Sequence, residues 1–264
     1  MIIDSHVHIG TYGRFYKSKQ KVIESFAKYN IDFGLVSSCD AVEYTSKGNN
    51  LPFFLKRNQI SCSKDVIRFC KKNPSKFKCL FWCKPATEGY DDKIEQFILD
   101  NKEYIVGFKF HPYYSKMRMT DQKILPYIRL AEKLDLPVLV HTARDLYSDA
   151  KYTYELAKRF PKVKFILGHM QLETNSHRDA IKYMKELPNL YGDTAWVNPN
   201  ALKEALKVLG SDRILFGSDN PIDGVDTYNH ERYQFIFKEL DKEAREDILY
   251  RNAIKLFKLK FEQF

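Results

Sequence analysis

The chain has 264 residues, of which 44% are hydrophobic, and this is enough for one large domain with a substantial core. No stretch approaches the roughly 20 apolar residues of a membrane span, and the N-terminus lacks the basic and then apolar residues of a secretion signal, so we expect a cytoplasmic protein without a membrane partner. The net charge of +9 comes from lysines spread along helical segments without a nucleic-acid-binding motif. It therefore favours a solvated surface over a nucleic-acid partner, although it also suits an anionic substrate.

In chain order, apolar runs typical of strands alternate with segments of helical periodicity. Strands are expected at residues 1–4, 33–37, 77–83, 105–110, 137–140, 163–167, 190–193 and 214–217. Helices are expected between them, for example at 63–72 and 121–134, where Pro126 would shift the start of the helix or bend it. Eight such units without a glycine-rich phosphate motif predict an α/β fold, a (β/α)8 TIM barrel, as one domain spanning residues 1–264.

Two histidines one residue apart, His6 and His8, follow the first apolar run. Side chains alternate along a strand, so both imidazoles would lie on one face and could bind one metal ion. Three later apolar runs also end in a residue that can bind metal, namely His141, His169 and Asp219. The active site of a (β/α)8 barrel lies at the carboxyl ends of its strands, so these five residues predict a shared metal centre. His177 and His230 lie in polar stretches and are expected to be solvated or to contact substrate indirectly.

The same alternation places companions on the faces that carry these residues. Asp4 would share a face with His6 and His8, and Lys109 would share one with His111. A lysine ammonium facing a divalent ion is unfavourable, unless the lysine is carboxylated or pairs with a substrate anion or with Asp219. The five cysteines leave one over from complete pairing, which indicates a reducing compartment, and Cys79 and Cys83 are expected to be small buried hydrophobic residues.

Motifs of a known family extend over nearly the whole chain. They are Ile2 to His8, Gly107 to Pro112, Leu136 to His141, Phe160 to His169, Asp212 to Pro221 and Asn252 to Phe257. With this set in this order, the chain resembles the amidohydrolase superfamily, and especially the amidohydrolase-related branch that includes aminocarboxymuconate-semialdehyde decarboxylase.

For a centre with one ion, the resemblance implies that the ligands are His6, His8, His141 and Asp219, with His169 beside them as a catalytic or water-orienting residue. For a centre with two ions, it implies that a carboxylated Lys109 bridges them and that His169 joins the ligands. We expect one divalent ion, zinc, with manganese as the alternative.

The predicted function is that of a metal-dependent hydrolase, in which a metal-activated water attacks an amide, ester or lactone of a small anionic substrate. Asp219 and His169 would be the catalytic residues, and Lys109, His111 and Arg144 would bind the substrate. The segment from Asp40 to Ile60 is a candidate lid, and a homo-oligomer is compatible with the sequence. A metal-dependent decarboxylase or hydratase of the same branch is the alternative, and a catalytically silent barrel that acts as a binding protein is a more remote one.

Overall fold

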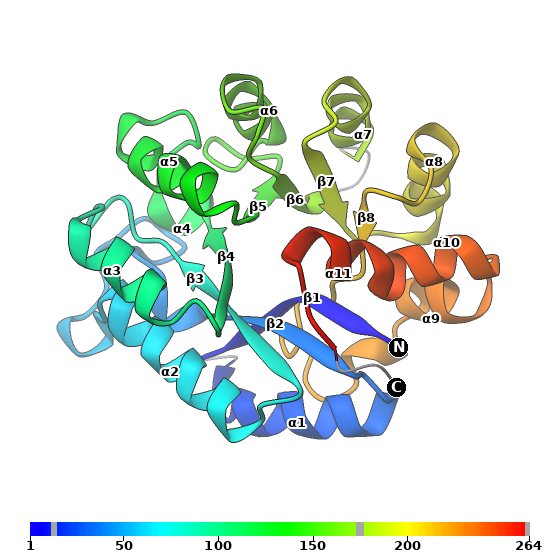
Figure 1. Cartoon of the computed structure of the whole chain (residues 1–264), viewed down its shortest axis with the longest axis horizontal. Helices are drawn as coiled ribbons and strands as arrows, with labels where there is room; N and C mark the ends of the chain where they lie inside the picture. The colour runs from blue at the N-terminus through cyan, green and yellow to red at the C-terminus, as the bar shows by residue number, and fades with distance from the viewer. Residues whose placement is uncertain (12–14, 173–176, 262–264) are drawn as a thin grey trace.

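The computed structural model describes residues 1–11, 15–172 and 177–261. Within it, eight parallel strands form one sheet in which each strand pairs with the next along the chain (Figure 1). The strands are β1 (Ile3–Ile9), β2 (Phe33–Ser38), β3 (Phe77–Trp82), β4 (Ile105–Phe110), β5 (Val138–Ala143), β6 (Phe165–Leu172), β7 (Leu190–Asp193) and β8 (Ile214–Leu215).

The sheet closes through the segment that follows the short strand β8. Asn220 bridges Val7 in the parallel sense, the Asp219 amide donates to the His6 carbonyl at 2.8 Å, and the His8 amide donates to the Asn220 carbonyl at 2.8 Å. These bonds join the last unit to β1 and complete the predicted TIM barrel.

Helices surround the barrel (Figure 1). They are α1 (Ser18–Tyr29), α2 (Gln59–Lys72), α3 (Asp92–Asp100), α4 (Pro112–Ser115), α5 (Leu125–Leu134), α6 (Ala150–Arg159), α7 (His177–Glu186), α8 (Pro199–Leu209), α9 (Glu231–Lys238), α10 (Lys242–Glu246) and α11 (Asn252–Phe257). The helix predicted at 63–72 begins earlier, because the Asn58 side chain caps the Ser61 amide at 2.7 Å. Pro126 lies in the first turn of α5, where its missing N–H costs no helical hydrogen bond, so it shifts the start of the helix as predicted.

Two layers make up most of the hydrophobic core, and a smaller cluster lies around Trp82. Inside the barrel, Leu35, Leu80, Leu139 and other strand residues pack against α11, which lies across one end of the barrel (Figure 1). A larger layer lies between the strands and the surrounding helices. The α11 helix fills the amino end of the barrel, so polar side chains can gather at the carboxyl ends of the strands. In the part of the chain described above, no helix has the length and apolar character needed to cross a membrane.

Strand β1 is longer than predicted, and one prediction about its faces is wrong. Ile3 packs in the inner layer, whereas Val7 packs in the outer layer, so the alternation breaks between them. The register of β1 against β2 is irregular in the same place, between Asp4 and Val7. The Asp4 carboxylate accepts hydrogen bonds from Ser218 and Tyr228 and does not share the face of His6 and His8, because this irregularity inverts the parity.

Candidate metal centre

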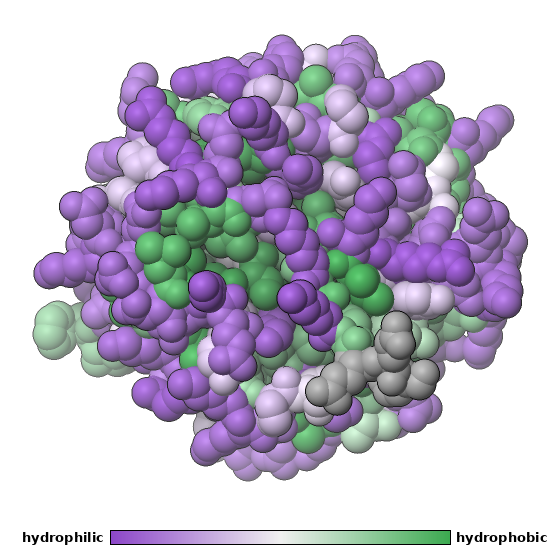
Figure 2. Space-filling view, viewed as in Figure 1, coloured by the Kyte–Doolittle hydropathy of each residue, from purple (hydrophilic) through white to green (hydrophobic). Residues whose placement is uncertain are grey.

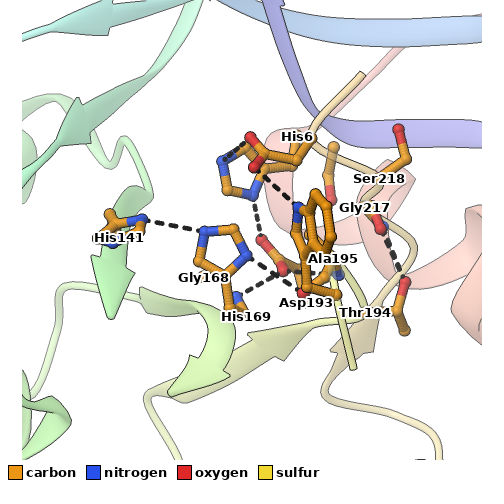
Figure 3. Close-up of polar contacts among 12 residues, drawn as sticks. His6, His141, Gly168, His169, Asp193, Thr194, Ala195, Gly217 and Ser218 are labelled. Carbon is orange, nitrogen blue, oxygen red and sulfur yellow. Dashed lines mark hydrogen bonds and ion pairs between the residues drawn. The ribbon is translucent and has the colours of Figure 1, made fainter. Parts of the chain in front are cut away.

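The predicted ligand residues meet at the carboxyl ends of the strands. His6 and His8 lie within β1, His141 within β5 and His169 within β6, whereas Asp219 follows β8. Figure 3 shows His6, His141 and His169 pointing toward the same region. His6, His8, His169 and Asp219 are buried, and His141 is half-buried. The barrel therefore brings together side chains that are more than 200 residues apart in the sequence.

Three of the four predicted ligands form a group that could hold one ion: His6, His8 and Asp219. Asp219 Oδ1 lies 2.9 Å from His8 Nε2 and 3.6 Å from His6 Nε2. Two imidazole nitrogens and a carboxylate oxygen are a donor set that zinc and manganese both accept. The chemistry and burial of these residues fit a divalent ion.

A buried aspartate orients the first of these ligands. Asp193, at the end of β7, places Oδ2 2.8 Å from His6 Nδ1, and its side chain is fully buried. Asp193 Oδ1 accepts the backbone amides of His169 at 2.8 Å and Ala195 at 3.1 Å (Figure 3). Because the carboxylate accepts the Nδ1 proton of His6, the lone pair of His6 lies on Nε2, the nitrogen that faces Asp219.

His6, His169 and Asp193 form a second group with suitable donor atoms. Both oxygens of Asp193 already accept hydrogen bonds from the protein. We therefore interpret this group as the support of His6 rather than as a separate ion site.

Lys109 lies against the face of His6 that would bind metal. Its Nζ is 2.7 Å from His6 Nε2, and the side chain is fully buried. Burial lowers the pKa of Lys109 to about 8, although the Asp219 and Asp193 carboxylates act in the opposite direction. The amine is therefore still mostly protonated at physiological pH, but it gives up its proton more readily than an exposed lysine would when a divalent ion binds nearby. A carboxylated Lys109 that bridges two ions remains a prediction for a centre with two ions.

His8 has a partner that suits either of its tautomers. Its Nδ1 lies 2.9 Å from the hydroxyl of Ser37, which can donate or accept a hydrogen bond. In this structure the Nε2 proton of His8 is donated to Asp219. When that proton moves to Nδ1, Nε2 becomes free to bind metal while the contact with Ser37 is kept.

The fourth predicted ligand, His141, is not part of the group formed by His6, His8 and Asp219. Its Nδ1 lies 3.0 Å from His169 Nε2, and His169 Nδ1 lies 3.1 Å from the Ala195 carbonyl (Figure 3). The carbonyl can only accept, so His169 donates through Nδ1 and accepts the Nδ1 proton of His141 through Nε2. His141 then keeps a free lone pair on Nε2, as a ligand needs, and its role in metal binding remains a prediction.

The buried site keeps its imidazoles neutral and Asp219 charged. Burial lowers the pKa of His169 to about 4, and it also lowers the pKa values of His6, His8 and His141. Burial acts to raise the pKa of Asp219, but the hydrogen bond from His8 and the electrostatic influence of the surrounding histidines hold it well below its usual range. Neutral imidazoles and an ionised carboxylate are the states that bind a metal ion.

The predicted substrate-binding residues differ in their positions. The ring of His111 is stacked between Trp82, at 5.5 Å, and His141, at 3.9 Å. Its Nδ1 is buried and has no hydrogen-bond partner among the described residues. Arg144 follows β5 but is exposed. His111 is therefore part of the wall of the site. The binding of substrate by His111 and by Arg144 stays a prediction.

For His177, the expectation of a solvated side chain is wrong, and an indirect contact with substrate stays a prediction. His177 is buried, and its Nδ1 donates to the Met170 carbonyl at 2.8 Å, because α7 packs against the end of β6. His230 is partly exposed and pairs with Asp223 at 3.0 Å, in agreement with the prediction.

Two residues of the site, Asp193 and Trp196, are absent from the predicted set of site residues. Asp193 ends a predicted strand as Asp219 does, so the same signal could have identified it. Trp196 donates its indole N–H to Asp219 Oδ2 at 3.0 Å, and no sequence pattern indicates this contact.

A family model described as amidohydrolase matches residues 48–259. The chain belongs to the amidohydrolase family. The matched segment includes Lys109, His141, His169 and Asp219, and it begins after His6 and His8. It corresponds to the amidohydrolase-related branch that the motifs indicated. No curated protein sequence matches the chain.

Solved structures of decarboxylases are similar to the chain over nearly its whole length. A 2,6-dihydroxybenzoate decarboxylase complexed with 2,6-dihydroxybenzoate has a TM-score of 0.70 and 18% identity, over 98% of this chain and 99% of that chain. A 5-carboxyvanillate decarboxylase from Novosphingobium aromaticivorans, complexed with manganese and a nitrobenzoic acid, has a TM-score of 0.73 and 11% identity, over 98% and 96%. A dihydroxybenzoic acid decarboxylase from Polaromonas with manganese and 2-nitroresorcinol has a TM-score of 0.71 and 17% identity, over 97% and 96%.

At these identities, the likeness shows the fold. Membership of the amidohydrolase family, together with the buried His and Asp group, makes the protein a metal-dependent enzyme of the barrel type.

Proposed function

We propose that the protein is a metal-dependent, non-oxidative decarboxylase that acts on a small hydroxylated aromatic carboxylic acid. The observation that carries this proposal is the buried group of His6, His8 and Asp219, set in a barrel that resembles aromatic acid decarboxylases from end to end. The proposal favours the decarboxylase alternative over the hydrolase that we expected from the sequence.

The walls of the site suit an aromatic anion. Trp82, His111 and His141 form a continuous stack of rings beside Lys109, whose Nζ lies 5.9 Å from the centre of the Trp82 ring. Flat rings favour a flat substrate, and the lysine offers a hydrogen-bond donor and partial positive charge to its carboxylate. A bound divalent ion would add the charge that holds the carboxylate and a neighbouring hydroxyl oxygen.

Decarboxylation breaks the bond between the ring carbon and the carboxyl carbon and releases CO2, and the electron pair left on the ring carbon takes up one proton that comes from solvent. We assign the transfer of this proton to Asp219, which lies among the proposed ligands and has one oxygen, Oδ1, on their side. His169 accepts the Nδ1 proton of His141 and donates to the Ala195 carbonyl, so we assign it the orientation of His141.

The test is a screen of manganese-loaded and zinc-loaded protein against 2,6-dihydroxybenzoate and other hydroxybenzoates in D2O. We expect metal-dependent release of one equivalent of CO2 and one deuterium at the carbon that carried the carboxylate. Asp219→Asn should abolish turnover, and Asp223→Asn, which alters a carboxylate near His230, is the matched control. Hydrolysis of amides, esters or lactones without any CO2 release would contradict the proposal and would favour the metal-dependent hydrolase predicted from the sequence.

A further inference from the structure

Trp196 lies in a backbone conformation that bulky residues rarely adopt. It follows β7 by three residues, and its φ of 63° is in the left-handed region. Such a conformation is unfavourable in a residue other than glycine and persists only where the surroundings enforce it. The side chain is half-buried at the edge of the site.

Two residues of α9 hold Trp196 in place. The Arg232 guanidinium lies 4.4 Å from the centre of the indole ring, within cation–π range. The Tyr233 hydroxyl lies 3.5 Å from the Trp196 amide and donates to the Ser218 carbonyl at 2.9 Å. Ser218 precedes Asp219, so the same tyrosine joins the segment of Trp196 to that of Asp219.

The indole N–H is directed at the proposed metal ligand. Trp196 Nε1 donates to Asp219 Oδ2 at 3.0 Å, whereas Asp219 Oδ1 lies on the side of His8 and His6. The two oxygens of one carboxylate are thus divided between the indole and the imidazoles. Rotation of Asp219 about its terminal bond would break the hydrogen bond with Trp196.

We propose that Trp196 is a positioning residue that holds Asp219 Oδ2, so that only Oδ1 is presented to the metal ion. The proposal rests on the assignment of Asp219 as a ligand, which is part of the proposed function. The strained backbone of Trp196 follows from this role, because it directs the indole nitrogen toward a carboxylate on a different segment.

The test uses Mn²⁺ alone as the probe and needs no substrate. The chain has two tryptophans, so Trp82→Phe leaves Trp196 as the single indole fluorophore. In Trp82→Phe, we expect Mn²⁺ to change the Trp196 emission with saturation at one equivalent. Trp196→Phe keeps a ring beside Arg232 but has no N–H. We expect it to bind Mn²⁺ about 10- to 100-fold more weakly than Trp82→Phe, since a hydrogen bond to a charged group that supports the ion is lost.

The outcomes separate this proposal from the proposed function. If Mn²⁺ binds to Trp82→Phe without altering the Trp196 emission, the proposal is overturned even where Trp196→Phe does not fold. An unchanged affinity in a folded Trp196→Phe would overturn it as well. A wild-type protein that binds neither Mn²⁺ nor Zn²⁺ would instead remove the metal centre on which both proposals depend.

Discussion

Asp193→Asn should weaken metal binding without touching a proposed ligand. The variant amide can still accept the backbone amides of His169 and Ala195 through Oδ1, and its NH2 group then faces His6 Nδ1. The opposite orientation would leave two buried backbone donors facing a third donor, so it is the less stable one. Because Nδ1 of His6 then faces an NH2 group, it must accept a hydrogen bond, and the ring proton of His6 moves to Nε2. That proton blocks the lone pair that the ion requires.

The size of the effect follows from the interaction that is lost. To bind metal, His6 in the variant must return its proton to Nδ1, and it then loses its hydrogen bond with the amide of residue 193. In the wild type, His6 binds metal and keeps its charge-assisted hydrogen bond of 2.8 Å to Asp193. Hydrogen bonds to charged groups contribute about 1.5–3 kcal/mol, and the loss of a residue that supports a metal ligand typically costs 10- to 100-fold in affinity. We expect the dissociation constant for Mn²⁺ to rise by about 10- to 100-fold.

The assay is calorimetric titration of metal-free protein with Mn²⁺, with circular dichroism as the check on folding. Asp145→Asn is the control, because Asp145 accepts backbone amides in a turn after β5 and contacts none of the proposed ligands. If folded Asp193→Asn binds Mn²⁺ within twofold of the wild type, then Asp193 does not set the tautomer of His6 and our account of the site is wrong.

Two further predictions concern buried acids and thiols. Burial raises the pKa of Asp4 to about 7 from an unfolded value of 3.8, so the folded state binds the extra proton and its stability falls as pH rises from about 4 through 7. A pKa difference of about 3 corresponds to ~4 kcal/mol of folding free energy. Urea unfolding at pH 5 and at pH 8 should therefore show a smaller loss of stability between the two pH values in Asp4→Asn than in the wild type. Equal losses in the two proteins would refute this prediction. Burial also raises the pKa values of the free, buried thiols at residues 39, 62, 70, 79 and 83, so a thiol reagent at pH 8 should label none in the native protein and five in denaturant. Rapid labelling of the native protein would contradict that burial.

The regular part of the fold could be predicted because parallel barrel strands are nearly continuous apolar runs. All eight strands are present, and β4 and β7 have the predicted bounds. The apolar run predicts a first strand that ends at Asp4, whereas β1 continues through five further residues, some of them polar, to Ile9. They continue the strand because the barrel buries them with partners, as Ser5 shows by donating to the Phe216 carbonyl.

The sequence predicts some residues of the site but not the contacts that hold them in place. Strand ends identified His6, His8 and Asp219, because the carboxyl ends of parallel strands converge. The support of those ligands depends on contacts across the barrel, as between Asp193 and His6, which are 187 residues apart. His177 lies among polar residues in the sequence and was therefore expected to be solvated, but the fold buries it.

Unusual backbone conformations gather where the proposed chemistry takes place. Ten described residues other than glycine have positive φ, and five of them lie at or just beyond the carboxyl ends of β6, β7 and β8: His169, Met170, Gln171, Trp196 and Asp219. The other five cap the ends of helices. Each conformation has a cost that local sequence preference would avoid, so it must be stabilised by tertiary contacts. Asp193 holds the His169 amide, and Tyr233 contacts both the Trp196 amide and the Ser218 carbonyl. The hydrogen bonds of the eight regular strands fix the ends from which these segments depart. The residues that place the ligands are therefore those whose conformations depend most on the completed barrel.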